Sequence, residues 1–441
     1  MPKKLTQKHL RQYFLDGCKK PGDLKIGVEW EKIGVYRNTG RAIPYAGRRG
    51  VLAIFRAMIQ NYDWQPVYFA KRLIGLKKRG ASITLEPGGQ IELSGQKADR
   101  LAANAAELHS HLSEIHAVSE KMGIVWLGIG AQPISLVREI PWVPKERYRL
   151  MRKSLKDKGA LTYSMMKETA SIQISIDYVS ESDAAEKFRL ATALSPVLSA
   201  MFANSPLTGG KANGFFSRRV YIWRHTAPER TGLVEKAFDP RFSFDDYVDY
   251  ALGVPMLFII RNQKMIAVKG VDFRAFLEEG YEGHRARKED WELHLSTIFT
   301  EVRFKRYIEI RCLDCQRTPV ALSAPALIKG LFYDKKSRQA AWKLVSGISP
   351  VERRRLFMEV PRRGLYVRLG KQDLWPVAFR LLKYAEEGLS RLSPEERGYL
   401  TPLKDLILHQ HIMPAELLLR CFSAAKTRKQ QVKRIIDCAS I

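Results

Sequence analysis

The sequence has few cysteines and no long apolar run. These two features argue against a disulfide-stabilised protein and against a membrane-spanning protein. Its five cysteines are too few, for 441 residues, to form a disulfide framework. Cys312 and Cys315 form a C-x-x-C pair, but no second pair follows, so a structural zinc site is not expected. They are either a redox pair or, as we favour, two unpaired thiols. No run of about 18 apolar residues occurs, so we expect no membrane span.

Targeting and nucleotide-binding signatures are also missing. The first residues, Met1 to Gln7, have no apolar signal core, so secretion is not expected and we predict a cytoplasmic protein. There is no G-x-x-x-x-G-K-[ST] phosphate loop and no G-x-G-x-x-G dinucleotide fingerprint. The commonest nucleotide-binding folds are therefore excluded.

The chain is strongly basic. It has 74 Lys and Arg against 46 Asp and Glu, a formal net charge of +28. Such a charge can mark a nucleic-acid or membrane-surface binder. The basic residues here are spread over the whole length, without interleaved aromatic residues at a nucleic-acid spacing. We therefore interpret them as a solvated basic surface that steers anionic substrates, with no nucleic-acid or membrane partner.

The pattern of apolar residues predicts an α+β protein. Helical spacing is found at 8–18, 51–62, 101–122, 148–158, 183–204 and 290–299. Strand patterns are found at 24–36, 64–69, 82–85, 90–93, 124–129, 170–178, 255–261 and 306–311. From Thr318 onward almost only helices are expected. We predict an α+β catalytic body, residues 1–317, with a helical region, residues 318–441, packed on it as one structural domain. The long segment 208–230 is predicted to be a functional loop.

Carboxylates recur on several of the predicted strands. Glu29 and Glu31 are two residues apart and therefore point to the same face of their strand. Glu86 and Glu92 flank a Pro-Gly-Gly turn, and Glu309 lies on another strand. Taken singly, each could be a solvated surface residue. On one shared sheet face they would repel one another unless cations screened them, and such oxygen ligands suit magnesium.

Arginines provide the opposite charge. Arg219 and Arg230 lie in the long predicted loop, and Arg311 lies beside Glu309. Arginine forks bind carboxylates and phosphates with two parallel hydrogen bonds. Clustered carboxylates with a metal, together with arginines for an acidic substrate, indicate phosphoryl transfer to a carboxylate.

Several motifs, in the same order along most of the chain, resemble the plant-type glutamate–cysteine ligases, a type also found in many proteobacteria. They are Gly27–Lys32, Leu85–Gly95, Phe202–Pro206, Asn213–Phe215, Tyr221–Trp223, Arg230–Gly232, Tyr247–Leu252 and Arg306–Arg311. The resemblance implies a curved antiparallel sheet flanked by helices, related to glutamine synthetase. It also implies that ATP phosphorylates the γ-carboxylate of glutamate and that the amine of cysteine attacks the acyl phosphate. The product would be γ-glutamylcysteine, the first step of glutathione synthesis.

The resemblance also implies roles for individual residues. The implied magnesium ligands are Glu29, Glu31, Glu86, Glu92 and Glu309. Gln173 and Lys305 would lie beside the metal-bound nucleotide. Arg219 and Arg311 would bind the α-carboxylate of glutamate or the transferring phosphoryl group, with Arg230 as a further substrate-binding residue. No side-chain nucleophile is expected.

Two departures from the family pattern keep an alternative open. Ala131 stands where the family has an aromatic residue, and Glu168 stands where it has an arginine after Met165-Met166. A carboxylate–amine ligase with another acceptor amine is therefore the second hypothesis. A third is a catalytically inactive relative that binds nucleic acid, against which the intact carboxylates argue. We expect a monomer or a homodimer.

Overall fold

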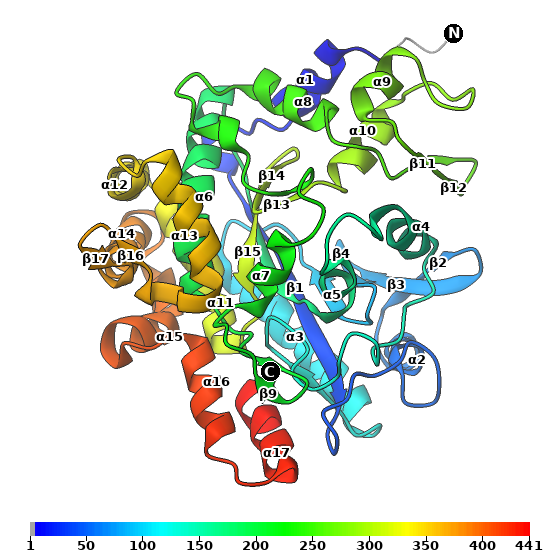
Figure 1. Ribbon diagram of the computed structural model, residues 1–441, viewed down its shortest axis with the longest axis vertical. Coiled ribbons are helices and arrows are strands. Elements are labelled where there is room, and N and C mark those ends of the chain that lie inside the picture. Colours follow the sequence, from blue (N-terminus) through cyan, green and yellow to red (C-terminus); the bar gives the residue numbers. More distant parts are fainter. Residues whose placement is uncertain (1–4) are drawn as a thin grey trace.

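A computed structural model describes residues 5–441; residues 1–4, on which the secretion prediction partly rests, lie outside the described part. Its centre is a nine-stranded antiparallel sheet (Figure 1). The sheet order is β14 (Val302–Phe304), β15 (Ile308–Asp314), β7 (Ser171–Ile176), β1 (Ile26–Tyr36), β5 (Ile91–Ser94), β4 (Ala81–Leu85), β3 (Arg72–Lys78) and β2 (Gln65–Phe69). The ninth strand, β6 (Ile124–Leu127), pairs with the far half of β1.

Strand β1 organises the sheet because it pairs with three other strands, β5, β6 and β7. Val28 and Trp30 point to one face, where they are buried in the main core. Glu29 and Glu31 alternate with them and therefore point to the opposite face. The two faces of β1 thus have different roles, one apolar and one acidic.

Helices cover both faces of the sheet. The amino-terminal part contributes α1 (Gln7–Leu15), α2 (Val51–Asn61), α3 (Leu101–Glu120), α4 (Glu146–Leu155), α5 (Thr162–Glu168), α6 (Glu181–Met201), α7 (Arg218–Arg224), α8 (Phe244–Leu252), α9 (Phe273–Glu278) and α10 (Lys288–Leu295). Short two-stranded sheets lie among them: β8–β9 (Leu207–Thr208, Lys211–Ala212), β10–β13 (Thr231–Gly232, Phe299–Thr300) and β11–β12 (Phe258–Arg261, Lys264–Ala267). Helices α3 and α11 pack against the apolar face of β1.

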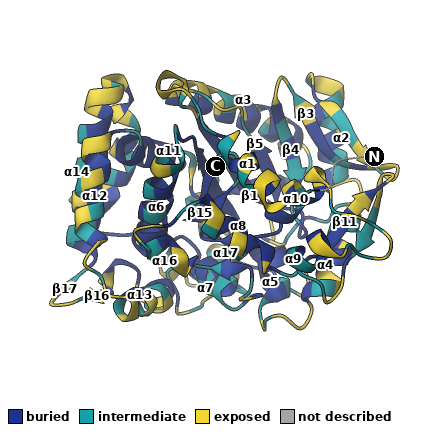
Figure 2. Ribbon diagram, turned by 90° about the horizontal axis from the view of Figure 1, so that it is seen from above, coloured by how far each residue is buried: buried dark blue, intermediate teal, exposed yellow. Residues whose placement is uncertain are grey.

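The carboxy-terminal part is helical, as predicted. It contains α11 (Thr318–Phe332), α12 (Lys335–Val345), α13 (Pro350–Arg363), α14 (Trp375–Leu392), α15 (Thr401–Lys404), α16 (Pro414–Ser423) and α17 (Arg428–Ala439), with one hairpin, β16–β17 (Arg368–Leu369, Gln372–Asp373). Exposed residues lie mainly on the outer sides of peripheral helices such as α12 and α14 (Figure 2). One apolar cluster runs from Leu10 to Met413, so both parts of the chain share a core.

The end of the chain closes on the sheet. Ser440 forms a bridge with Leu127 of β6, and the Gly128 amide donates a hydrogen bond of 2.8 Å to the Ala439 carbonyl. A disulfide between Cys421 and Cys438 joins α16 to α17. No sequence pattern indicates this pair, because the two cysteines are 17 residues apart in separate helices.

Two sequence predictions about local structure have different outcomes. The interpretation of Cys312 and Cys315 as unpaired thiols is confirmed, and both are buried. The prediction of a long loop at 208–230 is wrong, because the segment contains α7 and a short hairpin. Ser217 caps α7 by accepting a hydrogen bond from the Val220 amide at 3.1 Å. In the part of the chain that the structure describes, no helix is long and apolar enough to cross a bilayer.

Reduction of the Cys421–Cys438 disulfide should destabilise the α16–α17 pair. A closed loop of this size restricts the unfolded chain by about 3 kcal/mol in the chain-entropy model. We therefore expect Cys421→Ser to lower the midpoint of thermal unfolding by several degrees, and a reductant to do the same to the wild type. Cys18→Ser is the matched control, because Cys18 is a free thiol. If both substitutions lowered the thermal midpoint equally, the stabilising role of the disulfide would be contradicted.

Candidate active site

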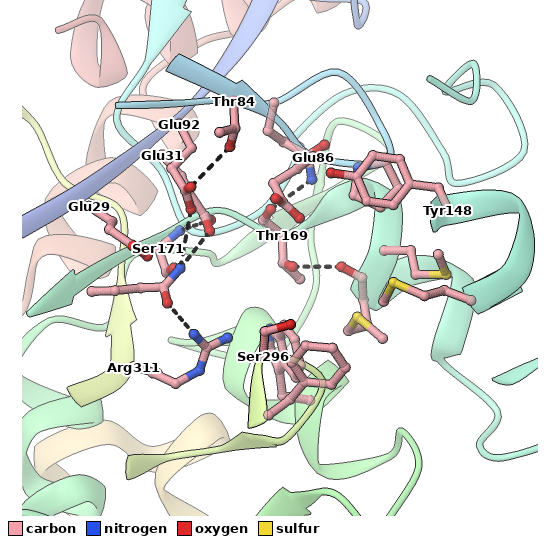
Figure 3. Close-up of a pocket in the computed structure, with 18 of the residues that line it drawn as sticks. Glu29, Glu31, Thr84, Glu86, Glu92, Tyr148, Thr169, Ser171, Ser296 and Arg311 are labelled. Carbon is pink, nitrogen blue, oxygen red and sulfur yellow. Dashed lines mark hydrogen bonds between the residues drawn. The ribbon is translucent and has the colours of Figure 1, made fainter. Parts of the chain in front are cut away.

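A cavity of about 290 Å³ lies on the acidic face of the sheet. Four of the predicted carboxylates line it: Glu29, Glu31, Glu86 and Glu92 (Figure 3). Helices α4, α5 and α7 close it from the side opposite the sheet, through Tyr148 and Met151, Met165 and Met166, and Arg219 and Trp223. The sequence placed Glu29 and Glu31 on one face of a strand, and the structure brings all four carboxylates to one cavity.

The strand register brings the polar side chains together. Glu31 of β1 is paired with Glu92 of β5, and Glu29 is paired with Gln173 of β7. Directly paired residues in antiparallel strands have their side chains on the same face, about 5 Å apart. Gln173 donates to Glu31 at 3.0 Å, and the Ser171 amide donates to Glu31 at 2.5 Å. Gln173 was predicted beside the carboxylates, and it lies there.

The four carboxylates hold their protons unusually strongly. Burial is the main reason why the pKa values of Glu29 and Glu31 are raised to about 8. Repulsion adds to it: Glu92 acts on both residues, Glu309 also acts on Glu29, and Glu86 also acts on Glu31. The pKa values of Glu86 and Glu92 are also raised, mainly by burial. Negative charge in this cavity is therefore under-compensated, and a bound cation would be stabilised there.

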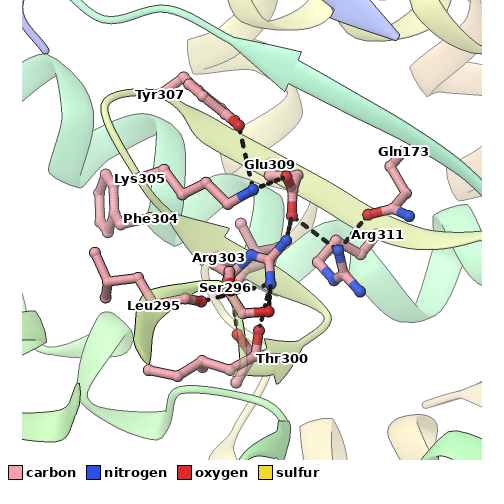
Figure 4. A network of polar contacts seen from close by, with 12 residues as sticks. Gln173, Leu295, Ser296, Thr300, Arg303, Phe304, Lys305, Tyr307, Glu309 and Arg311 are labelled. Carbon is pink, nitrogen blue, oxygen red and sulfur yellow. Dashed lines mark hydrogen bonds and ion pairs between the residues drawn. The ribbon is translucent and has the colours of Figure 1, made fainter. Parts of the chain in front are cut away.

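Glu309, the fifth predicted carboxylate, lies close enough to Glu29 to contribute to the raised pKa of that residue. It is fully buried, and it does not line the cavity. Its carboxylate is paired with Arg303, with Lys305 at 3.0 Å and with Arg311 at 2.8 Å (Figure 4). Burial alone would raise its pKa, but these three cations hold the pKa well below its usual value. The sequence grouped Glu309 with the metal ligands, whereas its contacts here make it the counter-charge of these three cations, which we call the cationic wall together with Arg219.

That cationic wall contains three of the predicted residues. Arg311 donates to the Gln173 side chain as well as to Glu309. Arg219 donates to the Arg311 carbonyl at 2.8 Å and lies 3.9 Å from the carboxylate of Asp314. Lys305 lines the cavity beside them. The wall faces the carboxylates, so positive and negative groups oppose each other across the cavity.

Asp314 fixes Arg219 indirectly. Its carboxylate is fully buried and accepts hydrogen bonds from the Asn204 amide at 2.9 Å, the Ser205 hydroxyl at 2.7 Å and the Ser217 hydroxyl at 2.9 Å. The Ser205 hydroxyl in turn accepts from the Arg219 amide at 3.0 Å. The start of α7 is thereby attached to the end of β15, which sets the direction of the Arg219 side chain.

Arg230 is not brought to this cavity. Its guanidinium donates to the carbonyl of Thr297 at 2.9 Å and to the carbonyl of Pro255 at 2.5 Å. It is 1% exposed and borders a different cavity, near Met256 and Asp272. The structure therefore gives no contact that supports the predicted substrate-binding role of Arg230. Its bonds to backbone carbonyls fix the segment that carries Ser296 and Phe299, two residues of the candidate site.

Sequence reasoning missed several residues of the cavity. Lys145 and Arg147, at the start of α4, line its far end, and Arg303 lines the cationic wall. In the sequence Lys145 and Arg147 directly precede the basic helix predicted at 148–158, and no spacing rule connects them to the carboxylates. The two residues that depart from the family pattern, Ala131 and Glu168, lie behind the residues that line the cavity. Ala131 is fully buried and bridges to Thr169, and Glu168 lies 3.7 Å from Arg218.

Magnesium fits this donor set only in part. Within residues 5–441, no three carboxylate, histidine or thiol groups converge closely enough to hold a metal ion by themselves. Magnesium, however, commonly takes one or two protein carboxylates and completes its shell with substrate phosphates and water. The excess of carboxylates and their raised pKa values match that mode of binding.

Known proteins resemble this chain over most of its length. Residues 25–436 match the family described as glutamate–cysteine ligase family 2. The chloroplastic glutamate–cysteine ligase of Arabidopsis thaliana is 41% identical over 95% of this chain and 80% of its own length. The chloroplastic glutamate–cysteine ligase B of Oryza sativa subsp. japonica is 39% identical over 96% of this chain and 85% of its own length.

The chain belongs to the glutamate–cysteine ligase family. The resemblance seen in the motifs is confirmed, and so is the prediction of a ligase of this kind. A solved glutamate–cysteine ligase from Francisella tularensis, in complex with AMP, superposes with a TM-score of 0.57 at 13% identity, covering 94% of this chain and 88% of the other. That similarity concerns the fold, and it confirms the prediction of an α+β protein built on an antiparallel sheet.

The carboxylate cluster predicts a pH-dependent effect of magnesium on stability. A carboxyl group whose pKa is raised by folding favours the folded state below its unfolded pKa, near 4.5, and this contribution is lost as the pH rises through the folded pKa. For Glu29 and Glu31 that loss spans pH 4.5 to about 8. Magnesium should therefore raise the thermal midpoint more at pH 8.5 than at pH 6, measured by scanning fluorimetry with and without chelator. A shift independent of pH would contradict the assignment, and Glu31→Gln should reduce the difference.

Glu309→Gln distinguishes the two roles considered for Glu309. If Glu309 is mainly the counter-charge of Arg303, Lys305 and Arg311, the variant should retain magnesium dependence with an apparent affinity within a few-fold of wild type. Its Michaelis constant for glutamate should rise at least about 10-fold, because the loss of a charged partner costs roughly 1.5–3 kcal/mol. Glu31→Gln should instead lower the apparent affinity for magnesium. A large loss of magnesium affinity in Glu309→Gln would restore Glu309 as a ligand.

Proposed function

We propose that the cavity joins the γ-carboxylate of glutamate to the amine of cysteine at the expense of ATP. The observation that carries this proposal is one cavity lined both by four carboxylates, Glu29, Glu31, Glu86 and Glu92, and by a wall of cations. Carboxylates suit a metal-bound polyphosphate, and arginines suit the carboxylate of an amino acid. Both are substrates of a ligase that works through an acyl phosphate.

One or two of the four carboxylates would hold each Mg²⁺ ion, with phosphate oxygens and water completing its coordination. When bound, the metal neutralises negative charge that develops on the transferring phosphoryl group. Arg311 and Arg219 would orient glutamate by its α-carboxylate, with its γ-carboxylate directed toward the terminal phosphate. Gln173, bonded to both Glu31 and Arg311, would keep the acidic and basic sides of the site in register.

The reaction needs positioning groups and no protein nucleophile. The terminal phosphoryl group passes to a γ-carboxylate oxygen, and ADP leaves. The nitrogen of the acceptor then attacks the γ-carbonyl carbon, inorganic phosphate leaves, and the nitrogen loses a proton. No thiol among the described residues lines the cavity. Burial raises the pKa of the Cys315 thiol to about 12, so this thiol stays protonated.

The acceptor would occupy the less polar end of the cavity. Met151, Met165 and Met166 lie there with Trp223 and Phe299. Thioethers and aromatic rings form a soft, polarisable surface that suits the side chain of cysteine. Another small apolar amine is the alternative acceptor, because these residues provide no charge to discriminate between side chains.

The cellular setting is proposed on the sequence alone. We propose a cytoplasmic enzyme that acts as a monomer or a homodimer, without a nucleic-acid partner. Several curated relatives are named chloroplastic, which describes where those plant proteins reside. Gel filtration of the purified protein decides between the two oligomeric states.

Phosphate release from Mg-ATP with glutamate, with and without cysteine, tests the proposed function directly. We expect release to depend on both amino acids and γ-glutamylcysteine to be detected by mass spectrometry. Release that needs glutamate but ignores cysteine would favour the alternative acceptor, which a panel of small amines would then identify. No release under any of these conditions would refute the proposal, and salt-dependent retention on DNA would then favour the nucleic-acid-binding alternative.

A further inference from the structure

A second cavity lies at the end of the molecule where α15, α16 and α17 meet the start of α11 (Figure 1). Within residues 5–441 it shares no lining residue with the candidate active site. Its volume is about 290 Å³, near the lower limit of roughly 300 Å³ for small-molecule pockets. Most of its lining is apolar, and this part includes Val320, Pro402, Leu406, Pro414, Leu417, Leu418 and Ala439. The cavity therefore suits a small, mainly apolar molecule.

Two buried amide side chains interrupt this apolar lining. They belong to Asn204, which is 6% exposed, and to Gln316, which is 2% exposed. The Asn204 Nδ2 group donates to the carbonyls of Gly128 at 2.9 Å and Cys315 at 3.0 Å. The Gln316 Nε2 group donates to two further backbone carbonyls, at 2.6 and 3.2 Å. Because a carbonyl oxygen can only accept, these four bonds fix which end of each amide is the donor.

The oxygen of each amide is left without a partner. Among the described residues, no group donates to Oδ1 of Asn204 or to Oε1 of Gln316. Both oxygens remain within reach of a molecule the size of water. An acceptor in an apolar cavity costs free energy when it has no donor, and a ligand that donates to it removes that cost. The cavity therefore favours an apolar occupant that carries a hydrogen-bond donor.

The charges around the cavity favour a neutral donor. Helix α11 begins at Thr318, and Pro319 and Val320 of its first turn line the cavity. The amino terminus of a helix carries a partial positive charge, which disfavours an ammonium group. The two charged residues of the lining, Arg317 and Asp405, are exposed and of opposite sign, so they select neither sign. A hydroxyl, a primary amide or a ring N–H is the donor that fits.

We propose that this cavity is a second ligand site, which binds a small neutral molecule through an apolar body and a donor bonded to Asn204 and Gln316. The proposal does not depend on the reaction assigned to the active site. The backbone amide of Asn204 also donates to the Asp314 carboxylate at 2.9 Å. The occupant would therefore lie directly behind the network that fixes Arg219.

Titration calorimetry with indole and phenol tests the proposal. Each probe has a matched analogue in which an ether oxygen removes the donor: 1-benzofuran for indole and anisole for phenol. We expect indole and phenol to bind, and each analogue to bind about 5- to 100-fold more weakly, because it leaves buried acceptors unpaired. If neither indole nor phenol binds, or if both members of each pair bind equally, the proposal is overturned.

A substitution that fills the cavity locates the site. Leu417 lines the cavity and is 36% exposed, so Leu417→Trp should block it without disturbing the core, and indole binding should be lost. Leu392→Trp is the matched control, because Leu392 is 41% exposed on α14 and does not line the cavity. It should leave the affinity for indole unchanged.

Unchanged affinity for indole in Leu417→Trp would place indole elsewhere and overturn the proposal. Circular dichroism and the thermal midpoint check that each variant is folded. If Leu417→Trp does not fold, Val320→Phe fills the same cavity from α11 and should abolish indole binding in its place.

Discussion

The crowding of four carboxylates in one enclosed cavity is the constraint that shapes this structure. Glu29, Glu31, Glu86 and Glu92 lie close enough to raise one another's pKa values, in a space largely removed from solvent. Buried like charges cost free energy unless protons, metal ions or cationic side chains neutralise them. The cavity therefore has cations at both ends and, in the proposed function, metal and polyphosphate in the middle. Substrate binding and charge neutralisation are the same event in such a site.

The cations themselves need fixed positions, and two buried carboxylates provide them. Glu309 binds Arg303, Lys305 and Arg311, and Asp314 joins the end of β15 to the start of α7 near Arg219. Each is fully buried, so the loss of either would leave uncompensated positive charge beside the cavity. The carboxylates of this site thus divide into those that line the cavity and those that hold the cations lining it. Burial and the identity of the partners both separate the two groups, because Glu309 and Asp314 are fully buried whereas Glu29 and Glu86 are partly exposed.

Strand periodicity made part of the site predictable, whereas contacts that depend on tertiary structure were missed. Glu29 and Glu31 could be assigned to one face because side chains alternate along a strand, and the pairing of β1 with β5 and β7 completes the cluster. Glu309 has the same alternation, yet its three cationic partners depend on the turn between β14 and β15, which no local pattern specifies. The loop prediction for 208–230 failed because the glycines and asparagine of this segment precede a helix of only seven residues. Arg147 could not be predicted, because it is held at the cavity by hydrogen bonds to a residue 149 positions later in the chain.

The carboxy-terminal helices act on the site through the rigidity of the sheet. Helix α11 packs against β1 and β7 from the apolar side, and its position is fixed by α14. At Gly330 and Gly388 the two helices approach so closely that a Cβ atom on either glycine would collide with a backbone carbonyl oxygen of the other helix. Only glycine permits this contact. Since β1 carries Glu29 and Glu31 on its other face, a shift of α11 would be transmitted to the carboxylate spacing on which charge neutralisation depends. The helical region is therefore part of the catalytic unit, although none of its residues lines the cavity.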